Sequence, residues 1–443
     1  RPMKWILATV GLLVVGLIFQ LQYLVYAMYA LLGILLLNRF FTRQWTEKIT
    51  VQRHAAGEVF ELGASCEFTL TVTNQGALPV PWLLLEDALA TDALAESPRR
   101  LEVAGARLKL VRLARNESTT LAYQVTFRQR GYYQFGPLLL ETGDVFGLHR
   151  RFQVAGEPAF ALVLPKVLPV QGYNLASRRP FGAIRVTHRL FEDPTRLAGV
   201  RPYQPGDPLN RVHWRATARS GALHSRVFET SRITGATFLL DFHATSFAGA
   251  HGRLSGELAI TTVASLANAV FITGQQIGCL TNGRDAADRI REEGWQAQYL
   301  NRTEAQQRAR TPQTNDRLQP VRVPNGRGLD KMRQILETLA RLESTDGLNF
   351  SELIATAGSQ IAHDATVIAV LGQVTPESAL ALGQLTHQGY LVTAIVVAFD
   401  AEPIPDWAQP PEWANLLLAQ GIDFRLVNSE EAISHLCTEA LIH

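Results

Sequence analysis

A long apolar stretch comes first in the hydrophobic pattern of the chain. No charged residue occurs from Trp5 to Leu37, and Gln20 and Gln22 are its only strongly polar side chains. One helix of this length would be about 50 Å long at 1.5 Å per residue, whereas a hydrocarbon core is about 30 Å thick. The pattern therefore predicts a transmembrane helical hairpin that turns at the glutamines. Its arms of about 22 Å require shallow insertion or local thinning of the bilayer.

The orientation of this hairpin follows from the cations at its flanks. Basic residues lie on both sides of the apolar stretch and none lies at its middle, the five being Arg1, Lys4, Arg39, Arg43 and Lys48. The positive-inside rule then places both flanks in the cytoplasm. An uncleaved signal peptide with an exported domain is the alternative, although no small-residue cleavage site follows the first apolar core. We expect a plasma-membrane protein whose soluble domains face the cytoplasm.

The next region, from Ile49 to about Leu164, has a hydrophobic period of two. Phe68, Leu70 and Val72 alternate with threonines, and Leu121 to Phe127 alternates in the same way. Short strands with frequent turn residues are typical of an immunoglobulin-like β-sandwich of roughly 110 residues. No catalytic constellation occurs in this region, which favours a spacer or docking module. The glycine-bracketed stretch Gly143 to Leu148 is expected to close it as a turn.

Residues 165–235 contain prolines and arginines that predict an extended segment followed by a short helix. Asp207 suits the N-cap, Pro208 the first helical position and Gly221 the C′ position. A helix between them would align three arginines at intervals of four residues in one cationic ridge, namely Arg211, Arg215 and Arg219. A strand-like segment then begins at Leu223.

Three interpretations of this ridge stay open. The arginines can tie domains together through carboxylates, because arginine forms bidentate pairs with them. They can instead bind an acidic protein partner or an anionic ligand such as a nucleotide phosphate. Nucleic-acid binding fits least, since the ridge lacks interleaved aromatic residues and the following domain is acidic.

From residue 234 onward, apolar β-branched runs alternate with amphipathic helical patterns. This alternation predicts a parallel sheet covered by helices on both faces. The polar stretch from Asn301 to Gly328 interrupts it and is predicted to be a long surface loop. The expected strands are 236–241, 276–280, 366–371, 391–399 and 424–427, and the expected helices are 254–271, 331–342, 376–387, 411–419 and 429–441.

Ligands of such sheets sit at the carboxyl ends of the strands, and Asp241 ends the first one. The loop that begins there resembles the Asp-x-Ser-x-Ser metal-ion-dependent adhesion site of von Willebrand factor A-like domains. Asp241 and Thr245 fit that pattern, whereas His243 offers an imidazole nitrogen, which Mg²⁺ disfavours. The later strand end carries Gly372 in place of an acid. A degenerate site that keeps only the fold is the favoured interpretation, and a bound Mg²⁺ the alternative.

Charge is distributed unevenly over these regions, although the formal net charge is only +2. The net charges are +5 for residues 1–53, −2 for 54–164, +8 for 165–235 and −9 for 236–443. Three widely spaced cysteines, Cys66, Cys279 and Cys437, form neither a disulfide framework nor a zinc pattern and indicate a reducing compartment. Phosphate-binding loops, dinucleotide fingerprints, zinc-protease motifs and nucleophile elbows are absent from the sequence.

A longer signature begins at Gly199 and continues through the predicted helix. Its two segments, Gly-Val-Arg-Pro-Tyr-Gln-Pro-Gly-Asp-Pro and Arg-Val-His-Trp-Arg-Ala-Thr-Ala-Arg, resemble the bacterial domain-of-unknown-function family fifty-eight. The order of hairpin, β-rich region, signature and A-like domain also agrees with that family. The resemblance marks as binding candidates Arg201, Tyr203, Gly206, Asp207, Arg211, His213, Trp214, Arg215, Arg219 and Glu229. It assigns none of them a chemical role.

The resemblance implies a partner as well. Members of the family are typically encoded beside MoxR-type AAA+ ATPases, so it implies a membrane-anchored, non-enzymatic adaptor for such an ATPase in complex assembly or maturation. An accessory subunit of a larger membrane complex and a metal-dependent A-domain binding protein are the alternatives. The expected division is a membrane hairpin (1–45), a β-sandwich (46–165), a basic connector (166–233) and an α/β domain (234–443).

Overall fold

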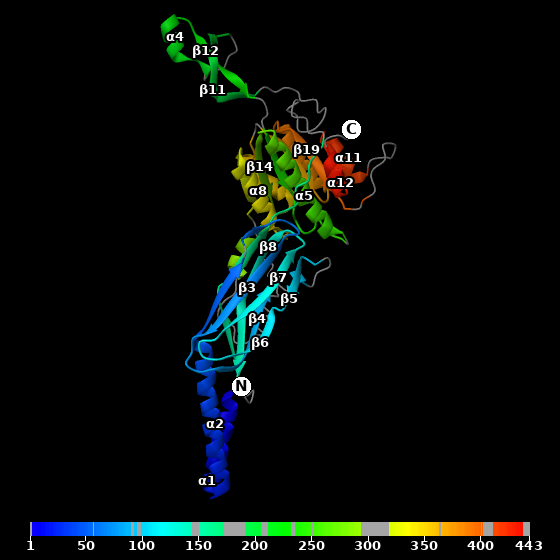
Figure 1. The fold of residues 1–443 in the computed structure, drawn as a ribbon. Coiled ribbons are helices and arrows are strands. Elements are labelled where there is room, and N and C mark those ends of the chain that lie inside the picture. The colour runs from blue at the N-terminus through cyan, green and yellow to red at the C-terminus, as the bar shows by residue number, and fades with distance from the viewer. Residues whose placement is uncertain are drawn as a thin grey trace. The chain divides into compact units, whose positions relative to one another are not determined.

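The computed structural model of the 443-residue chain is a multidomain structure of several sheets and helices (Figure 1). It describes residues 2–55, 57–89, 93–94, 99–143, 150–171, 191–204, 211–231, 235–249, 251–293, 319–362, 365–399, 401 and 411–436. The chain divides into two compact units, one of residues 1–165 with 286–313 and the other of residues 166–285 with 314–443.

Two helices begin the first unit. Helix α1 spans Pro2–Ile18 and helix α2 spans Gln22–Glu47. The chain reverses between them at Gln20, whose φ of 55° lies in the left-handed region. Gly16 lets the helices approach closely, because a Cβ there would lie 3.2 Å from a Val25 methyl carbon. Many of their apolar side chains are exposed, including Leu7, Val15, Leu17, Tyr26, Leu36 and Leu37.

Two sheets follow and share one hydrophobic core. The first is antiparallel and has the order β1 (Ile49–Ala55), β3 (Ser65–Asn74), β7 (Ser118–Phe127), β5 (Leu101–Gly105). The second has the order β2 (Val59–Phe60), β10 (Ala159–Val163), β8 (Gly131–Gly143), β4 (Val80–Leu89), β6 (Leu108–Leu113), with β9 (Arg150–Ala155) also paired to β8.

The predicted period of two is confirmed in β3 and β7. Phe68, Leu70 and Val72 are buried while their neighbours along β3 are more exposed, because successive side chains of a strand point to opposite faces. Aromatic stacking joins the two sheets: the Phe68 ring on β3 lies 4.2 Å from that of Phe135 on β8, and within the first sheet it lies 5.6 Å from that of Tyr123. The turn predicted at Gly143 to Leu148 lies mostly outside the described residues, and β9 and β10 follow it.

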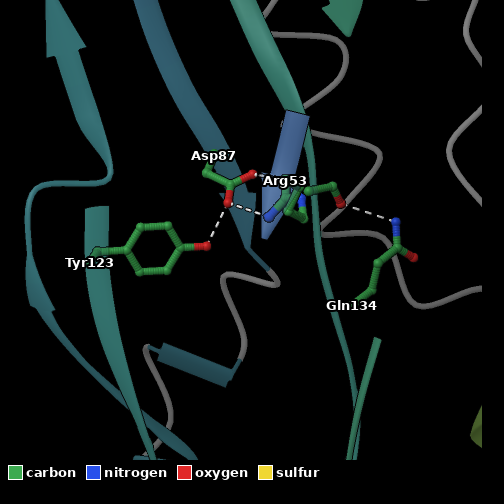
Figure 2. A network of polar contacts seen from close by, with 5 residues as sticks. Arg53, Asp87, Tyr123 and Gln134 are labelled. Atoms are coloured by element: carbon green, nitrogen blue, oxygen red, sulfur yellow. Dashed lines mark hydrogen bonds and ion pairs between the residues drawn. The ribbon is translucent and has the colours of Figure 1, made fainter. Parts of the chain in front are cut away.

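A buried ion pair also connects these sheets (Figure 2). Arg53 on β1 donates two hydrogen bonds to Asp87 on β4, at 2.7 and 2.5 Å, in a bidentate pair. Tyr123 on β7 donates a third to the same carboxylate, at 2.5 Å. The Asp87 side chain is fully buried and that of Arg53 is 8% exposed. Burial and the neighbouring carboxylate raise the pKa of the Tyr123 hydroxyl, which therefore stays protonated and can donate.

Gly136 is required beside this pair. Its φ is 83°, and a Cβ at this position would lie 2.2 Å from an Arg53 guanidinium nitrogen. Gln134 donates a hydrogen bond to the carbonyl oxygen of Gly136, at 3.1 Å, and so fixes the same stretch of β8. Any side chain at 136 would displace the guanidinium from Asp87.

The second unit contains a six-stranded sheet. The order is β16 (Val321–Gly326), β14 (Gln276–Thr281), β13 (Gly235–Leu240), β18 (Thr366–Leu371), β19 (Val392–Val397), β20 (Asp423–Val427). Its first strand in the chain, β13, lies inside the sheet, with β14 and β16 on one side and β18, β19 and β20 on the other. All neighbouring pairs are parallel except β14 with β16, which is antiparallel. Because β13, β18 and β19 are buried along their whole length, they read as continuous apolar runs in the sequence.

Helices cover both faces of this sheet. One face packs against α5 (Gly252–Ile272), α8 (Leu329–Arg341) and α12 (Glu430–His435). The other packs against α9 (Phe350–Ala357), α10 (Pro376–His387) and α11 (Glu412–Ala419). Shorter elements are β15 (Arg284–Asp285), α6 (Ala286–Glu293), β17 (Leu342–Glu343) and the 3₁₀ turn η2 (Gly358–Gln360).

Helix α5 has the length and hydropathy of a membrane span. However, 78% of its apolar window is buried inside the domain, so it is the central helix of a protein core. The helices α1 and α2 contain shorter apolar runs, 6–18 and 22–37. Their exposed side chains distinguish these runs from α5.

The predicted loop from Asn301 to Gly328 is wrong at its end. Residues 321–326 form β16, which runs against the direction of its neighbour and makes the sheet mixed rather than parallel. The residues Val-Arg-Val-Pro-Asn-Gly gave little strand signal, because an edge strand is buried on few of its positions and here includes a proline. Backbone hydrogen bonds to β14 stabilise this strand, although its own sequence has little strand propensity.

The buried pair between the two sheets of the first unit gives a stability prediction. Asp87→Asn leaves the Arg53 guanidinium buried without its counter-charge, which we expect to lower the free energy of opening of β1 and β4 by about 3–5 kcal/mol. Hydrogen–deuterium exchange of the full chain measures this strand by strand. Glu102→Gln, which breaks the exposed pair with Arg128, is the control and should leave the exchange of β1 and β4 nearly unchanged, because water and salt screen an exposed pair. Equal effects of the two substitutions would contradict the assigned role.

Candidate functional site

The first candidate site is the loop that follows β13 at the carboxyl edge of the sheet. Asp241 begins this loop, and its side chain is 2% exposed. One carboxylate oxygen accepts hydrogen bonds from the Asn282 side-chain amide, at 2.8 Å, and from the backbone N–H of His243, at 3.2 Å. The other accepts a short hydrogen bond from the Ser246 hydroxyl. Both oxygens of Asp241 are therefore engaged by the protein itself.

The partners of Asp241 also fix the surrounding loops. Asn282 directly follows β14, and its side-chain oxygen accepts from the backbone N–H of Phe242, at 2.6 Å, while its amide also donates to the carbonyl of Leu348, at 2.9 Å. Thr345 lies in the loop between β17 and α9, and its carbonyl accepts from the Ala244 backbone, at 2.8 Å. Three chain segments thus meet at the end of β13.

The side chains of His243 and Thr245 pair with each other. The Nδ1 atom of His243 lies 2.7 Å from the Thr245 hydroxyl oxygen and also accepts from the Thr245 backbone N–H, at 3.3 Å. Thr245 is exposed and His243 is half-buried. The hydrogen bonds of the described residues thus join Thr245 to His243, and none of them joins Thr245 to Asp241.

Burial changes the acidity of Asp241. Removal from water raises the pKa of its carboxyl group, since the charged form is disfavoured there, and the hydrogen bonds from Ser246, Asn282 and His243 oppose that shift only in part. Asp241 is therefore better suited to accept hydrogen bonds within the fold than to bind a metal ion reversibly.

The missing acid at position 372 has a steric cause. Gly372 ends the neighbouring strand β18, and a Cβ there would lie 2.3 Å from the backbone oxygen of Ser246 and 2.5 Å from the Phe247 ring. No carboxylate fits where the adhesion-type site would need one. Within the ranges described, no group of three or more His, Cys, Asp or Glu side chains could hold a metal ion. The residues present do not fit a divalent cation.

A cavity of about 420 Å³ lies beside this loop at the ends of β18, β19 and β20. None of the described residues that line it carries an ionisable side chain; they are Gly372, Gln373, Val374, Val396, Ala398, Ala401, Pro411, Trp413 and Leu426. Such a lining can contact an apolar group but supplies no acid, base or nucleophile.

The second candidate site is the signature region, which forms a hairpin of β11 (Phe191–Pro202) and β12 (His224–Ser231) with helix α4 (Trp214–Ser220), drawn in green in Figure 1. We call these three elements the arm. Arg201 pairs with Ser225 across the two strands, and the Tyr203 backbone donates to Leu223, at 2.9 Å. Gly206 and Asp207 lie outside the described residues, and Glu229 lies on β12.

The predicted helix is wrong at its beginning and right at its end. Val212 forms a β-bridge with Ser225, so no continuous helix runs from Pro208, and α4 starts at Trp214. Arg211 therefore does not share a helical ridge with Arg215 and Arg219. Gly221 ends the helix with a φ of 71°, as its sequence position predicted.

His213 is the N-cap of α4. Its Nδ1 accepts from the backbone N–H of Ala216, at 3.0 Å, and its own backbone donates to the carbonyl of His224, at 2.8 Å. Thr217 accepts from the His224 backbone, at 3.1 Å, and Ser220 lies 3.1 Å from the His224 ring nitrogen. These contacts fix α4 against β12, and they make His213 a positioning residue.

The fixed helix presents its largest side chain to solvent. Trp214 is 67% exposed, and Arg215 and Arg219 are exposed one helical turn apart. Arg226 on β12 is exposed as well. Among the described residues no carboxylate pairs with these three arginines.

Sequence reasoning missed Asn282, Thr345 and the role of Ser246. Asn282 could have been found, because it follows a buried strand at the same sheet edge as Asp241. Thr345 could not, since only the folded chain brings its loop beside His243.

Comparison with known proteins supports the signature. Residues 199–402 match the family described as protein of unknown function DUF58, which confirms the resemblance that the sequence predicts. The Bacillus subtilis protein printed as uncharacterized protein YeaD is 27% identical over 229 residues, which are 51% of this chain and 54% of that protein. The chain thus spans about half the length of this relative.

Solved structures give weak similarities. The CARDB domain of a Pyrococcus furiosus protein is 18% identical, with a TM-score of 0.17, and the match covers 26% of this chain and 88% of that one. A Clostridium perfringens cohesin module is 12% identical, with a TM-score of 0.19, over 27% of this chain and 98% of that one.

The raised pKa of Asp241 gives a pH prediction. The folded chain keeps this proton at a pH where the unfolded chain, with an aspartate pKa of about 3.9, has lost it. Stability therefore falls as the pH rises from about 4 through the raised value. We expect Asp241→Asn to remove this slope, which hydrogen exchange of β13 between pH 4 and 7 would measure. Parallel profiles for the two proteins would contradict the assignment.

Proposed function

We propose that this chain, which has the DUF58 region at residues 199–402, is a non-enzymatic, membrane-anchored adaptor of a MoxR-type AAA+ ATPase in the assembly or maturation of protein complexes. The closed Asp241 loop is the observation that supports this proposal most. It occupies the sheet edge where an α/β enzyme would hold its ligand, and its polar groups bind one another.

The exposed apolar helices support the membrane anchor. Helix α1 has 17 residues and the apolar run of α2 has 16, which correspond to about 26 and 24 Å of helix at 1.5 Å per residue. Both lengths approach the hydrocarbon thickness of about 30 Å, with the remainder met by local thinning. The clustered cations before and after them support a cytoplasmic location for both flanks.

The two globular parts then have separate roles in the adaptor. We interpret the paired sheets of the first unit as an immunoglobulin-like spacer, because their core is filled by side chains and joined by the Arg53–Asp87 pair. We interpret the six-stranded sheet as a von Willebrand A-like domain whose metal site is degenerate. Its strand order, with one antiparallel edge strand, and its Asp-x-His-x-Thr loop support this interpretation.

The partner is inferred from the family resemblance and from charge. The basic connector (+8) and the acidic α/β domain (−9) offer complementary surfaces to a second protein. The described residues that line the cavity at β18 to β20 are apolar or uncharged, which favours a docking role over catalysis.

Membrane topology can be tested directly. A reporter fused after Thr50 should be active only when the fusion point is cytoplasmic, because both apolar helices precede it. We expect a cytoplasmic signal from this fusion and a signal of opposite sign from one placed at Gln20, in the turn between the helices. An external signal at Thr50 would exclude a cytoplasmic adaptor.

The ATPase partnership can be tested by co-purification. The full chain, tagged and expressed at its native level, is extracted in mild detergent, and its associated proteins are quantified by mass spectrometry. We expect a stoichiometric AAA+ ATPase whose recovery falls at least about tenfold when salt screens the charged surfaces. Repeated recovery of the intact chain at low salt without any ATPase would argue against the proposal.

A further inference from the structure

We propose that the arm of one copy of this chain docks on the acidic C-terminal part of the α/β domain of a second copy. The proposal goes beyond the adaptor function and does not depend on it. It rests on the exposed groups of α4 and on the charge of the last hundred residues.

The arm has the composition of a binding surface. Between Gly199 and Arg226 the sequence has five arginines, and its single acid is Asp207. Trp214 is 67% exposed although it is the largest side chain of α4, and Val200 and Leu223 are 40% and 45% exposed. Tryptophan and arginine are the side chains most enriched among the residues that dominate binding energy at protein interfaces.

The arm is also preorganised. The His213 cap, the Val212–Ser225 bridge and the bond from His224 to Thr217 hold α4 in place. A partner then loses less conformational freedom on binding, because the helix that bears Trp214 is already ordered.

The C-terminal part of the chain supplies the complementary surface. Residues 343–443 contain thirteen acidic residues, and Arg425 is their single Lys or Arg, so their net charge is −12. Arg425 is buried, with 6% exposed, and so contributes little positive charge to the surface. The described acids that are exposed include Asp346, Glu352, Glu377, Glu412 and Glu431.

A second copy is the proposed occupant, because each copy carries both the basic arm and the acidic C-terminal part. Within the described residues, Arg215, Arg219 and Arg226 have no carboxylate partner in their own chain. Nucleic acid is disfavoured, because the same acidic region would repel its phosphates. Each copy carries both the arm and the acidic part. The interaction can therefore be reciprocal in a closed dimer or repeat head to tail in a filament.

Zero-length crosslinking of mixed isotopic copies tests this proposal. The full chain with Arg215→Lys and Arg219→Lys keeps its charge but gains amines, which a carbodiimide joins only to carboxylates in direct contact. ¹⁴N- and ¹⁵N-labelled copies are mixed in detergent and crosslinked. We expect mixed-isotope peptides that link positions 215 or 219 to acids within residues 343–443. Links within one isotope only, or to acids elsewhere, would overturn the proposal.

Sedimentation of the full chain in detergent provides the quantitative test. We expect self-association that weakens about tenfold in Arg215→Glu with Arg219→Glu, and by a similar factor in Trp214→Ala, which changes no charge. The control is Arg150→Glu with Arg151→Glu, which makes the same charge change on β9. A monomer at all concentrations, or equal weakening in the control, would overturn the proposal.

Discussion

The buried carboxylate of Asp241 is the constraint on which the candidate site depends. A carboxyl group with almost no contact with water needs hydrogen-bond partners in the protein, and here its donors come from Asn282, Ser246 and the His243 backbone. These donors draw the loops after β13 and β14 together. The Ser246 backbone then fills the space beside Gly372 in which a second acid would have to stand. The need to hydrogen-bond one buried carboxyl group thus gives the loop its order.

In the arm, too, local hydrogen bonds stabilise an element that would not be stable by itself. A helix of seven residues is too short to be stable by itself, because its nucleation is unfavourable and few backbone bonds follow. The His213 cap, the αL glycine at 221 and the bonds to β12 compensate for that shortness. The side chains that these contacts do not use are exposed to solvent, namely Trp214, Arg215 and Arg219. The signature therefore combines residues that build the arm with residues that are available to a partner.

The first unit shows the same relation between buried charge and packing. Arg53, Asp87 and Tyr123 come from three strands and place a bidentate ion pair beside a core of aliphatic and aromatic side chains. Such a pair contributes little net stability compared with apolar residues of the same size, but the loss of one partner is costly. The ion pair specifies which strands face each other across the two sheets. Stacked aromatic rings alone would specify this arrangement less precisely.

The sequence by itself determined the elements with strong periodicity. The strand at 366–371 and the helix at 376–387 are found where their patterns place them, because burial on a whole strand or one helix face leaves a clear hydrophobic period. The end of α4 at Gly221 was also predicted from the sequence, since few other residues adopt its positive φ. The family resemblance followed from a long contiguous motif.

Tertiary structure alone decided the features that join distant segments. The edge strand β16 has a weak local pattern and exists because β14 offers it backbone partners. The start of α4 moved to Trp214 because Val212 pairs with β12, a contact that no helical propensity records. The Asp241 loop is closed by Asn282 and Ser246, and the segment of Thr345 lies beside it across a hundred residues of sequence. Local patterns encode burial and backbone preference, whereas hydrogen-bond partners between separate loops depend on the packed fold.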